Sequence, residues 1–267
     1  MAKRITFQFD DDLDYQIQAI RSVVELFRGL SRHVDGIYRS NRIRKFGEGD
    51  PVRNSDIVVG RRLLENLRNV QLSNNLFADN ILADGNNFTI EMETGTGKTY
   101  VYLRTILELY HEYGFRKFMI VVPSIAIRKG VEKSMEQLND HFKRLYNIDI
   151  GKHSFIYDSN TPKQISSKLV ENNDLSICVL NIQAFNKDTN KIRKEDEYGQ
   201  NLWEDIKYIK PIVIIDEPQK IEGTAKKKSK SLVAIEELQP LFTLRYSATH
   251  KQLYNQIYKL DSWSIAS

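Results

Sequence analysis

Cysteine is almost missing from this chain of 267 residues, which has Cys178 alone. One thiol can form neither an internal disulfide nor a cysteine-based zinc site. Cys178 also lies in the apolar run 176–180, a setting that favours a buried structural thiol over a nucleophile. The cysteine content therefore excludes a disulfide scaffold and points away from thiol chemistry.

Long hydrophobic runs are missing as well. No apolar run approaches the roughly 20 residues that a membrane-spanning helix needs, so we expect no membrane partner. Residues 1–4, Met-Ala-Lys-Arg, are followed by the acidic run 10–12, where a signal peptide would have its apolar core. A cytoplasmic protein fits these two absences.

Charge of one sign is not in large excess either. The formal net charge is +4 and the pI is about 8.9, which permits a polyanionic partner without requiring one. An apolar content of 41% and a charged content of 28% are those of an ordinary globular protein. The length suffices for one large domain with an ample core.

Short apolar segments alternate with amphipathic ones along most of the chain. Strands are predicted at 4–9, 88–91, 118–122, 153–157, 175–180, 211–215 and 241–246, and helices at 13–28, 57–70, 100–113, 124–146, 162–170 and 232–238. This order predicts an α/β fold, with a mostly parallel sheet and helices on both faces. The polar stretch 31–87 is predicted to be an insertion.

The stretch Met92-Glu93-Thr94-Gly95-Thr96-Gly97-Lys98-Thr99 lies between a predicted strand and a predicted helix. Glycines let the backbone turn sharply, and the N–H groups at a helix N-terminus attract phosphate. A lysine can reach the outer phosphates, and a threonine hydroxyl can ligate Mg²⁺. We predict a nucleotide phosphate site formed by Thr94, Gly95, Thr96, Gly97, Lys98 and Thr99; a glycine-rich turn without a ligand is the alternative.

This phosphate loop departs from the common pattern G-x-x-x-x-G-K-[ST] at its first position. The first glycine of that pattern would fall at position 92, and this chain has Met92 there. The form M-x-T-G-T-G-K-T is a helicase-like variant of the loop. It points away from GTPases and small-molecule kinases.

Asp216 and Glu217 end the predicted strand 211–215. In an open parallel sheet the active residues lie at the carboxyl ends of the strands, and the phosphate loop, Pro123-Ser124 and Ser247-Ala248-Thr249 have the same placement. Asp216 is predicted to hold Mg²⁺ together with Thr99, and a second carboxylate can orient or deprotonate an attacking water. The alternative is an acidic turn without chemistry.

Two other nucleotide or metal chemistries are disfavoured. The segment 186–189, Asn-Lys-Asp-Thr, lacks the fourth-position carboxylate with which N-K-x-D reads guanine. The segment 205–207, Asp-Ile-Lys, ends like a metal-dependent nuclease pattern but has no strand context and no partner acid. Neither a GTPase nor a nuclease is therefore expected from these segments.

Taken together, the phosphate loop, Asp216-Glu217-Pro218-Gln219 and Ser247-Ala248-Thr249 resemble the motor domain of superfamily 2 helicases. More narrowly, they look like the Res subunit of type III restriction enzymes, as does Val121-Val122-Pro123-Ser124 with Ile127 and Gly130. The Asp-Glu-Pro-Gln box discriminates best, because most relatives carry Asp-Glu-Ala-His or Asp-Glu-Ala-Asp. The resemblance extends from about Phe7 to Thr249.

The resemblance implies a RecA-like lobe that binds ATP and Mg²⁺, with Lys98, Asp216 and Glu217 in the catalytic roles. Gln16 would read the adenine edge, although Leu13 stands where many relatives have an arginine that adds a contact. A solvated helix residue is the alternative for Gln16. Pro123 and Ser124 would meet the nucleic-acid backbone; a simple helix cap is the alternative for Ser124, and it can have both roles. Ser247, Ala248 and Thr249 would couple the ATP state to nucleic-acid binding.

The activity that the resemblance implies is ATP-driven translocation on duplex DNA, in a restriction complex with a methyltransferase subunit. Because the chain ends at Ser267, soon after Thr249, we expect a single motor lobe, without the second lobe and the nuclease domain of the family. A lobe of a stand-alone DNA or RNA helicase, or a nucleotide-binding interaction module without catalysis, are the alternatives. The basic clusters 39–45 and 226–230 are predicted to be solvated, with phosphate contacts as the alternative.

Overall fold

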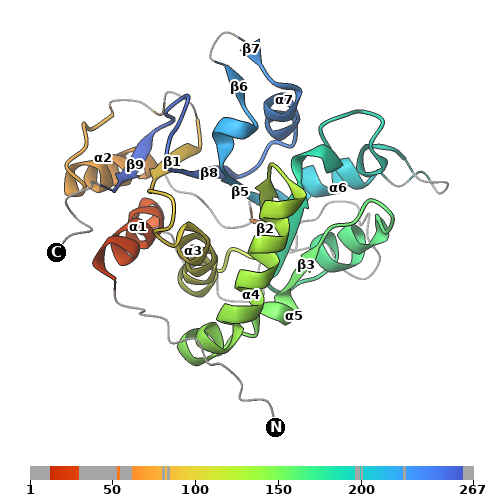
Figure 1. Cartoon of the computed structure of the whole chain (residues 1–267), viewed down its shortest axis with the longest axis horizontal. Helices are drawn as coiled ribbons and strands as arrows, with labels where there is room; N and C mark the ends of the chain where they lie inside the picture. The colour runs from red at the N-terminus through yellow and green to blue at the C-terminus, as the bar shows by residue number, and fades with distance from the viewer. Residues whose placement is uncertain are drawn as a thin grey trace.

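The protein is described from a computed structural model, over residues 13–29, 53–54, 62–79, 82, 85–195, 199, 201–224 and 227–260. The main sheet consists of β1 (Asn87–Glu91), β2 (Lys117–Val122), β3 (Ser154–Ile156), β4 (Ser176–Asn181), β5 (Ile212–Asp216), β8 (Phe242–Ser247) and β9 (Gln256–Lys259). Its strand order is β3-β4-β2-β5-β8-β1-β9, and every pair is parallel (Figure 1). The prediction of a parallel α/β sheet is confirmed.

Helices cover both faces of this sheet. They are α1 (Asp14–Val24), α2 (Leu63–Ser73), α3 (Lys98–Tyr113), α4 (Ile125–Tyr146), α5 (Ile150–His153), α6 (Leu202–Ile209) and α7 (Lys230–Glu237), with a π-helical segment η3 (Ile165–Val170) and the 3₁₀ segments η1 (Glu25–Phe27), η4 (Ile182–Ala184), η5 (Lys191–Arg193) and η6 (Pro218–Lys220). Alternate side chains of a strand point to opposite faces, and β2 shows the result. Phe118 and Ile120 pack with α1, α3 and α4, whereas Met119 and Val121 pack with η3, α6 and α7.

Most of the predicted elements are confirmed, with small shifts at their ends. The helix predicted over 124–146 begins at Ile125, because Ser124 adopts an extended conformation and accepts a hydrogen bond from the Ile127 N–H. Gly114 ends α3 in the left-handed conformation that favours glycine, at φ +78°. Cys178 is a buried free thiol in β4, in agreement with a structural role.

Several elements were not predicted from the sequence, among them a helix, an edge strand and a small hairpin. Helix α6 begins after Asn201, whose side chain accepts from two N–H groups of the first turn, and it buries Asp205 within the segment that partly matched a nuclease pattern. Strand β9 is short and, among the residues that the structure describes, pairs with β1 alone. The strands β6 (Gly223–Thr224) and β7 (Lys227–Lys228) form a small antiparallel hairpin that projects beside α7 in Figure 1.

Part of the predicted insertion packs on the main core. Helix α2 buries Leu63, Leu67 and Val70 against the same cluster that holds α1 and α3. The strand predicted at 4–9, the basic cluster 39–45, the start of the helix predicted at 57–61 and Lys226 lie outside the described residues. The division of the chain into one lobe with an insertion therefore stays a prediction.

The parallel arrangement brings the carboxyl ends of the strands to one edge. There β1, β2, β5 and β8 end at Glu91, Val122, Asp216 and Ser247, with the predicted site residues directly after them or at their ends.

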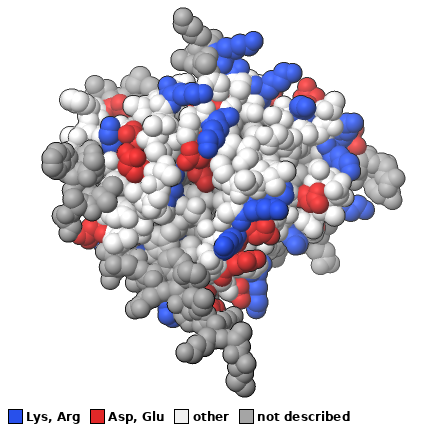
Figure 2. Space-filling model, in the orientation of Figure 1, with Lys and Arg blue, Asp and Glu red and all other residues white. Residues whose placement is uncertain are grey.

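On the face seen in Figure 2, basic side chains lie among acidic ones and form no single patch. Within the part of the chain that the structure describes, no helix is long and apolar enough to cross a membrane.

Candidate functional site

The phosphate loop connects β1 to α3 in the strand-loop-helix order that the sequence predicted. Gly95 and Gly97 have φ of +86° and +83°, a region that side chains with a Cβ rarely adopt. Met92 is fully buried in the main core, and its N–H donates a 2.8 Å hydrogen bond to the Ser247 carbonyl. At the position where the common pattern has glycine, this chain therefore has an apolar anchor that fixes the start of the loop beside β8.

Lys98 bends back across the loop. Its ammonium donates to the carbonyl oxygens of Met92, at 3.3 Å, and Glu93, at 3.2 Å. It also lies 3.7 Å from a carboxylate oxygen of Glu217. The charge is thus held over the mouth of the loop, on the side that faces the acidic end of β5.

A hollow of about 550 Å³ opens at this point. Its lining combines the phosphate loop, the start of α3, one side of α4 and the end of β5, namely Thr94, Gly95, Gly97, Lys98, Thr99, Tyr100, Ile127, Ser134, Gln137, Leu138, Asp216, Glu217 and Lys220. The structure therefore brings the predicted residues Lys98, Thr99, Asp216 and Glu217 together. Gln16, Thr96, Pro123, Ser124 and Ser247 to Thr249 do not line this hollow.

Asp216 is only 6% exposed at the end of β5. Burial raises the pKa of its carboxyl to about 6; the neighbouring Glu217 adds to the rise, while Lys98 opposes it. Its Oδ2 lies 3.5 Å from the Tyr102 hydroxyl, which is also 3.4 Å from the Thr99 Oγ1. Within the described part of the chain Asp216 has no salt bridge, and a buried carboxylate without one is costly to keep charged, so a cation at this position would stabilise it.

The oxygens of Thr99 and Asp216 are suitable for Mg²⁺ in kind and in number. Both contact the same Tyr102 hydroxyl, so they lie within two hydrogen-bond lengths of each other. Among the described residues, no group of three or more His, Cys, Asp and Glu could hold a metal ion. Mg²⁺ commonly takes one or two protein oxygens, several waters and substrate phosphates, and the two side chains here fit that mode of binding.

Glu217 adopts a left-handed backbone conformation, with φ +57°, that few residues other than glycine tolerate. Its N–H donates a 3.0 Å hydrogen bond to the Tyr246 carbonyl, which holds the turn against β8. The Gln219 side-chain amide donates to the Glu217 carboxylate, and the Ser247 hydroxyl donates a 2.7 Å bond to the Gln219 oxygen. The sequence singled out Gln219 only as part of the family resemblance. Its hydrogen bonds could not be predicted, because Ser247 is distant in sequence.

Ser247 and Thr249 form a compact turn at the end of β8. Ser247 is fully buried, and its Oγ accepts a 3.2 Å bond from the Thr249 N–H. The same Oγ lies 2.8 Å from the Thr249 carbonyl, so its single proton is shared between that oxygen and Gln219. Thr249 itself is exposed, so this turn connects Glu217, through Gln219 and Ser247, to the surface.

Pro123 and Ser124 lie at the end of β2. Ser124 caps α4, with its Oγ accepting from the Ile127 N–H at 3.3 Å, so a structural role as a helix cap is present. The Pro123 carbonyl accepts a 3.1 Å bond from the Gln183 side chain, which ties the end of β2 to the segment after β4. Contact of these two residues with a nucleic-acid backbone stays a prediction.

Gln16 is 7% exposed and braces the phosphate loop from α1. Its Nε2 donates a 2.9 Å hydrogen bond to the Thr96 carbonyl. A Cβ added at Gly97 would lie 2.5 Å from the same nitrogen, so the glycine permits a close approach as well as the turn. The structure thus places Gln16 against the loop, and its contact with adenine stays a prediction.

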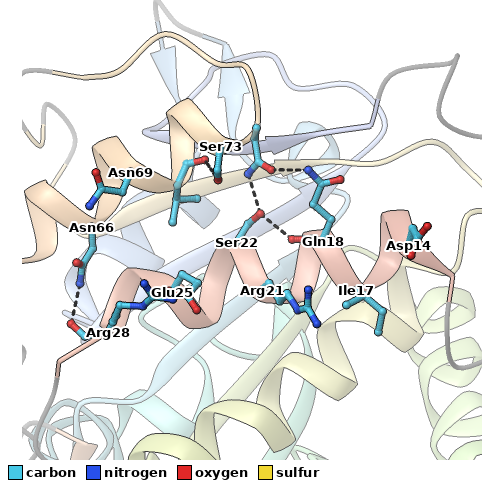
Figure 3. A pocket seen from close by; sticks show the side chains of 12 residues that line it. Asp14, Ile17, Gln18, Arg21, Ser22, Glu25, Arg28, Asn66, Asn69 and Ser73 are labelled. Carbon is cyan, nitrogen blue, oxygen red and sulfur yellow. Dashed lines mark hydrogen bonds and ion pairs between the residues drawn. The ribbon is translucent and has the colours of Figure 1, made fainter.

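A second hollow, of about 630 Å³, lies between α1 and α2 (Figure 3). Polar side chains on its walls bond to one another: Gln18 donates to Asn74 at 2.9 Å, and Asn74 donates to Ser22 at 2.7 Å. No residue of the predicted site lines it. Although it is the larger hollow, the candidate site is the one at the phosphate loop.

Comparison with known sequences identifies the family of this chain. Residues 11–252 match the family described as "Type III restriction enzyme, res subunit". The Res subunit of the type III restriction-modification enzyme EcoP15I of Escherichia coli is 30% identical over 74% of this chain and 22% of its own length. The EcoPI Res subunit of Escherichia phage P1 is 27% identical over 96% of this chain and 27% of its own length.

A third relative is the StyLTI Res subunit of Salmonella typhimurium, which is 31% identical over 62% of this chain and 18% of its own length.

Among solved structures, the SWI2/SNF2 ATPase core of Sulfolobus solfataricus, in complex with dsDNA, has a TM-score of 0.40 at 16% identity, over 70% of this chain and 31% of that one. The UvsW helicase of bacteriophage T4 has a TM-score of 0.41 at 13% identity, over 80% of this chain and 64% of the helicase chain. The chain spans about a quarter of the length of the curated relatives it matches. Since the family match covers most of the chain and includes the phosphate loop, the acidic strand end and the Ser-Ala-Thr turn, this chain belongs to the type III restriction enzyme Res-subunit family, as a helicase-like domain.

Proposed function

We propose that this chain is the ATP-binding motor lobe of a type III restriction enzyme and that its ATP hydrolysis drives translocation on duplex DNA. One observation carries the proposal. Lys98, Thr99, Asp216 and Glu217 surround a single hollow at the carboxyl edge of the sheet. Glu217 is in turn joined through Gln219 to Ser247, so the candidate catalytic carboxylate and the candidate coupling turn form one hydrogen-bonded unit.

The roles follow from where each group lies. The N–H groups of residues 94–97 and the start of α3 would bind phosphate oxygens, and Lys98 would leave its two carbonyl partners for the outer phosphates. Mg²⁺, held by Thr99 and Asp216, would neutralise phosphate charge. Glu217 retains 19% side-chain exposure beside Lys98, so it can reach a water next to the outer phosphate and orient or deprotonate it.

The DNA and the partners are proposed from family membership and from placement. Pro123, Ser124 and the turn Ser247-Ala248-Thr249 lie at the same sheet edge as the nucleotide hollow. A strand of DNA contacting that edge would meet Thr249, which is exposed. Because this chain spans about a quarter of its curated relatives, we propose that it works with a second motor lobe, a nuclease domain and a methyltransferase subunit.

The test is to measure ATP binding and ATP hydrolysis by this chain, with and without duplex DNA. We expect ATP and Mg²⁺ to bind and the turnover of the single lobe to be slow. Failure to bind ATP would contradict the assignment of the hollow. Fast, DNA-stimulated turnover by this chain alone would contradict the requirement for a second lobe.

A further inference from the structure

Tyr102 is a buried side chain in contact with both oxygens proposed to hold Mg²⁺. It lies on the first turns of α3, three residues after Thr99, so the two side chains share one face of the helix. Its hydroxyl is 3.4 Å from the Thr99 Oγ1 and 3.5 Å from the Asp216 Oδ2. No motif of the sequence identifies Tyr102, because the contact with Asp216 joins residues far apart in the chain.

The Tyr102 ring is held from the side of the sheet. It packs edge-on against the Tyr246 ring, with centroids 5.7 Å apart and an interplanar angle of 62°. Tyr246 lies on β8, directly beside Asp216 on β5 in the sheet register. Both rings are fully buried, so the hydroxyl of Tyr102 has little freedom to move away from the two oxygens.

The hydrogen-bond donors and acceptors can be assigned from chemistry. A phenol has an ordinary pKa of about 10 and is protonated at neutral pH, so the Tyr102 hydroxyl can donate one hydrogen bond. Its single proton goes to the carboxylate, the stronger acceptor. The Tyr102 hydroxyl is also 3.4 Å from the Thr99 Oγ1, and once its proton is given to Asp216, the Thr99 hydroxyl can donate to the Tyr102 oxygen and keep its own lone pairs free for a cation.

We propose that Tyr102 is a positioning residue of the magnesium site, which orients the Thr99 hydroxyl and the Asp216 carboxylate for a cation bound with the nucleotide. The inference rests on the proposed function. A metal ligand needs its lone pairs toward the cation and its proton away from it, and the Tyr102 oxygen is placed to accept a hydrogen bond from the Thr99 hydroxyl. Partners that orient metal ligands in this way commonly affect metal affinity by 10- to 100-fold. Both distances are long for hydrogen bonds, so either oxygen can turn to a cation without breaking a short bond.

The substitution Tyr102→Phe removes the hydroxyl and keeps the ring. The affinity of this chain for a non-hydrolysable ATP analogue is measured by calorimetry, once in EDTA and once in Mg²⁺, and the ratio of the two is the gain due to the metal. In Tyr102→Phe we expect the affinity in EDTA to stay within twofold and the metal-dependent gain to fall about tenfold. A general loss of folded protein would lower both affinities and leave their ratio unchanged.

Tyr246→Phe is the matched control. It removes a hydroxyl from the other ring of the same pair, where the partner is the Thr105 Oγ1 at 3.5 Å and not a metal ligand. We expect it to keep the full gain. The inference is overturned if Tyr102→Phe keeps the full gain or if Tyr246→Phe loses as much. If the unaltered chain fails to bind the analogue at all, the proposed function fails, and this inference fails with it.

Discussion

The Ser247 hydroxyl donates a 2.7 Å hydrogen bond to the side-chain oxygen of Gln219. Through the amide of the same glutamine, which donates to Glu217, the end of β8 is connected to the carboxylate that follows β5. Glu217 holds a left-handed backbone conformation, so its side chain depends on such contacts for its direction. A displacement of the Ser247 turn would therefore be transmitted to the carboxylate of Glu217 through one side chain, Gln219.

The first prediction concerns this link. Gln219→Met keeps the approximate volume and removes both hydrogen bonds. Hydrogen bonds to charged groups contribute about 1.5–3 kcal/mol, and a barrier raised by about 1.4 kcal/mol slows a reaction tenfold. We expect ATP hydrolysis to fall at least about tenfold and ATP affinity to change little, since Lys98 and the loop are untouched. Steady-state hydrolysis and equilibrium binding measure the two effects.

Gln18→Met is the control for that substitution. Gln18 is a glutamine on α1 whose amide donates to Asn74 at 2.9 Å, away from the candidate site. We expect its hydrolysis rate to equal that of the unaltered chain. A normal rate in Gln219→Met as well would mean that Glu217 is oriented without Gln219.

The second prediction compares two glycines of the phosphate loop. Gly95 and Gly97 have nearly the same φ, +86° and +83°, so an alanine strains the backbone similarly at both, by about 1–2 kcal/mol. A Cβ at Gly95 meets nothing within 4 Å, whereas a Cβ at Gly97 meets the Gln16 Nε2 at 2.5 Å. Gly97→Ala should therefore lower the free energy of unfolding more than Gly95→Ala, as measured by urea denaturation.

A double-mutant cycle with Gln16→Ala identifies the cause of that difference. Removing the Gln16 amide also removes the atom that a Cβ at position 97 would meet. The two substitutions should be less than additive at Gly97 and additive at Gly95. Equal additivity at both positions would show that the contact with Gln16 has no energetic consequence.

The sequence predicted what depends on local pattern. The phosphate loop, the acidic end of β5 and the buried strands each lie within a few consecutive residues, and parallel strands place their carboxyl ends at one edge. The capping role of Ser124 was also visible, since serine before an amphipathic run commonly begins a helix. Helix α6 carried a similar signal at Asn201, but the charged residues before it obscured the pattern.

The remaining features depend on distant residues. Whether the Gln16 amide reaches the Thr96 carbonyl, or Tyr102 reaches Asp216, is decided by how α1 and β5 pack against α3. Strand β9 has little apolar length, and its place is fixed by pairing with β1. Such contacts have no signature in a single sequence, because the residues on each side are common in many other settings.

The third prediction concerns Lys98. Its ammonium has two carbonyl partners and one carboxylate neighbour, all of which belong to the site itself. Lys98→Ala removes a charge-assisted phosphate contact of about 1.5–3 kcal/mol, which corresponds to a loss of ATP affinity of at least about tenfold. Lys133→Ala, at an exposed lysine of α4, changes the net charge equally and should bind ATP normally. Unchanged affinity in Lys98→Ala would disprove the phosphate-loop assignment.

The last prediction uses the pKa of Asp216, which burial and Glu217 raise from 3.8 to about 6. The folded state therefore holds this proton more tightly than the unfolded state does, so stability falls as the pH rises through the interval between these values and stays lower above it. The penalty at neutral pH is on the order of 3 kcal/mol, because each pKa unit corresponds to 1.36 kcal/mol. Asp216→Asn, which cannot ionise, should stabilise the chain at pH 7.5 in EDTA.

At pH 4 the same substitution should have little effect, because the native carboxyl is then protonated and uncharged. Urea denaturation of the two chains at both pH values measures the difference. Glu93→Gln, at an exposed carboxylate of the phosphate loop, serves as the control and should change the free energy of unfolding by less than about 0.5 kcal/mol at either pH. A gain for Asp216→Asn that is equal at pH 4 and pH 7.5 would show that the cost at this position does not come from the charge. If the cost does come from the charge, adding Mg²⁺ and nucleotide at pH 7.5 should reverse the order of stability, since a bound cation favours the carboxylate whose charge burial penalises.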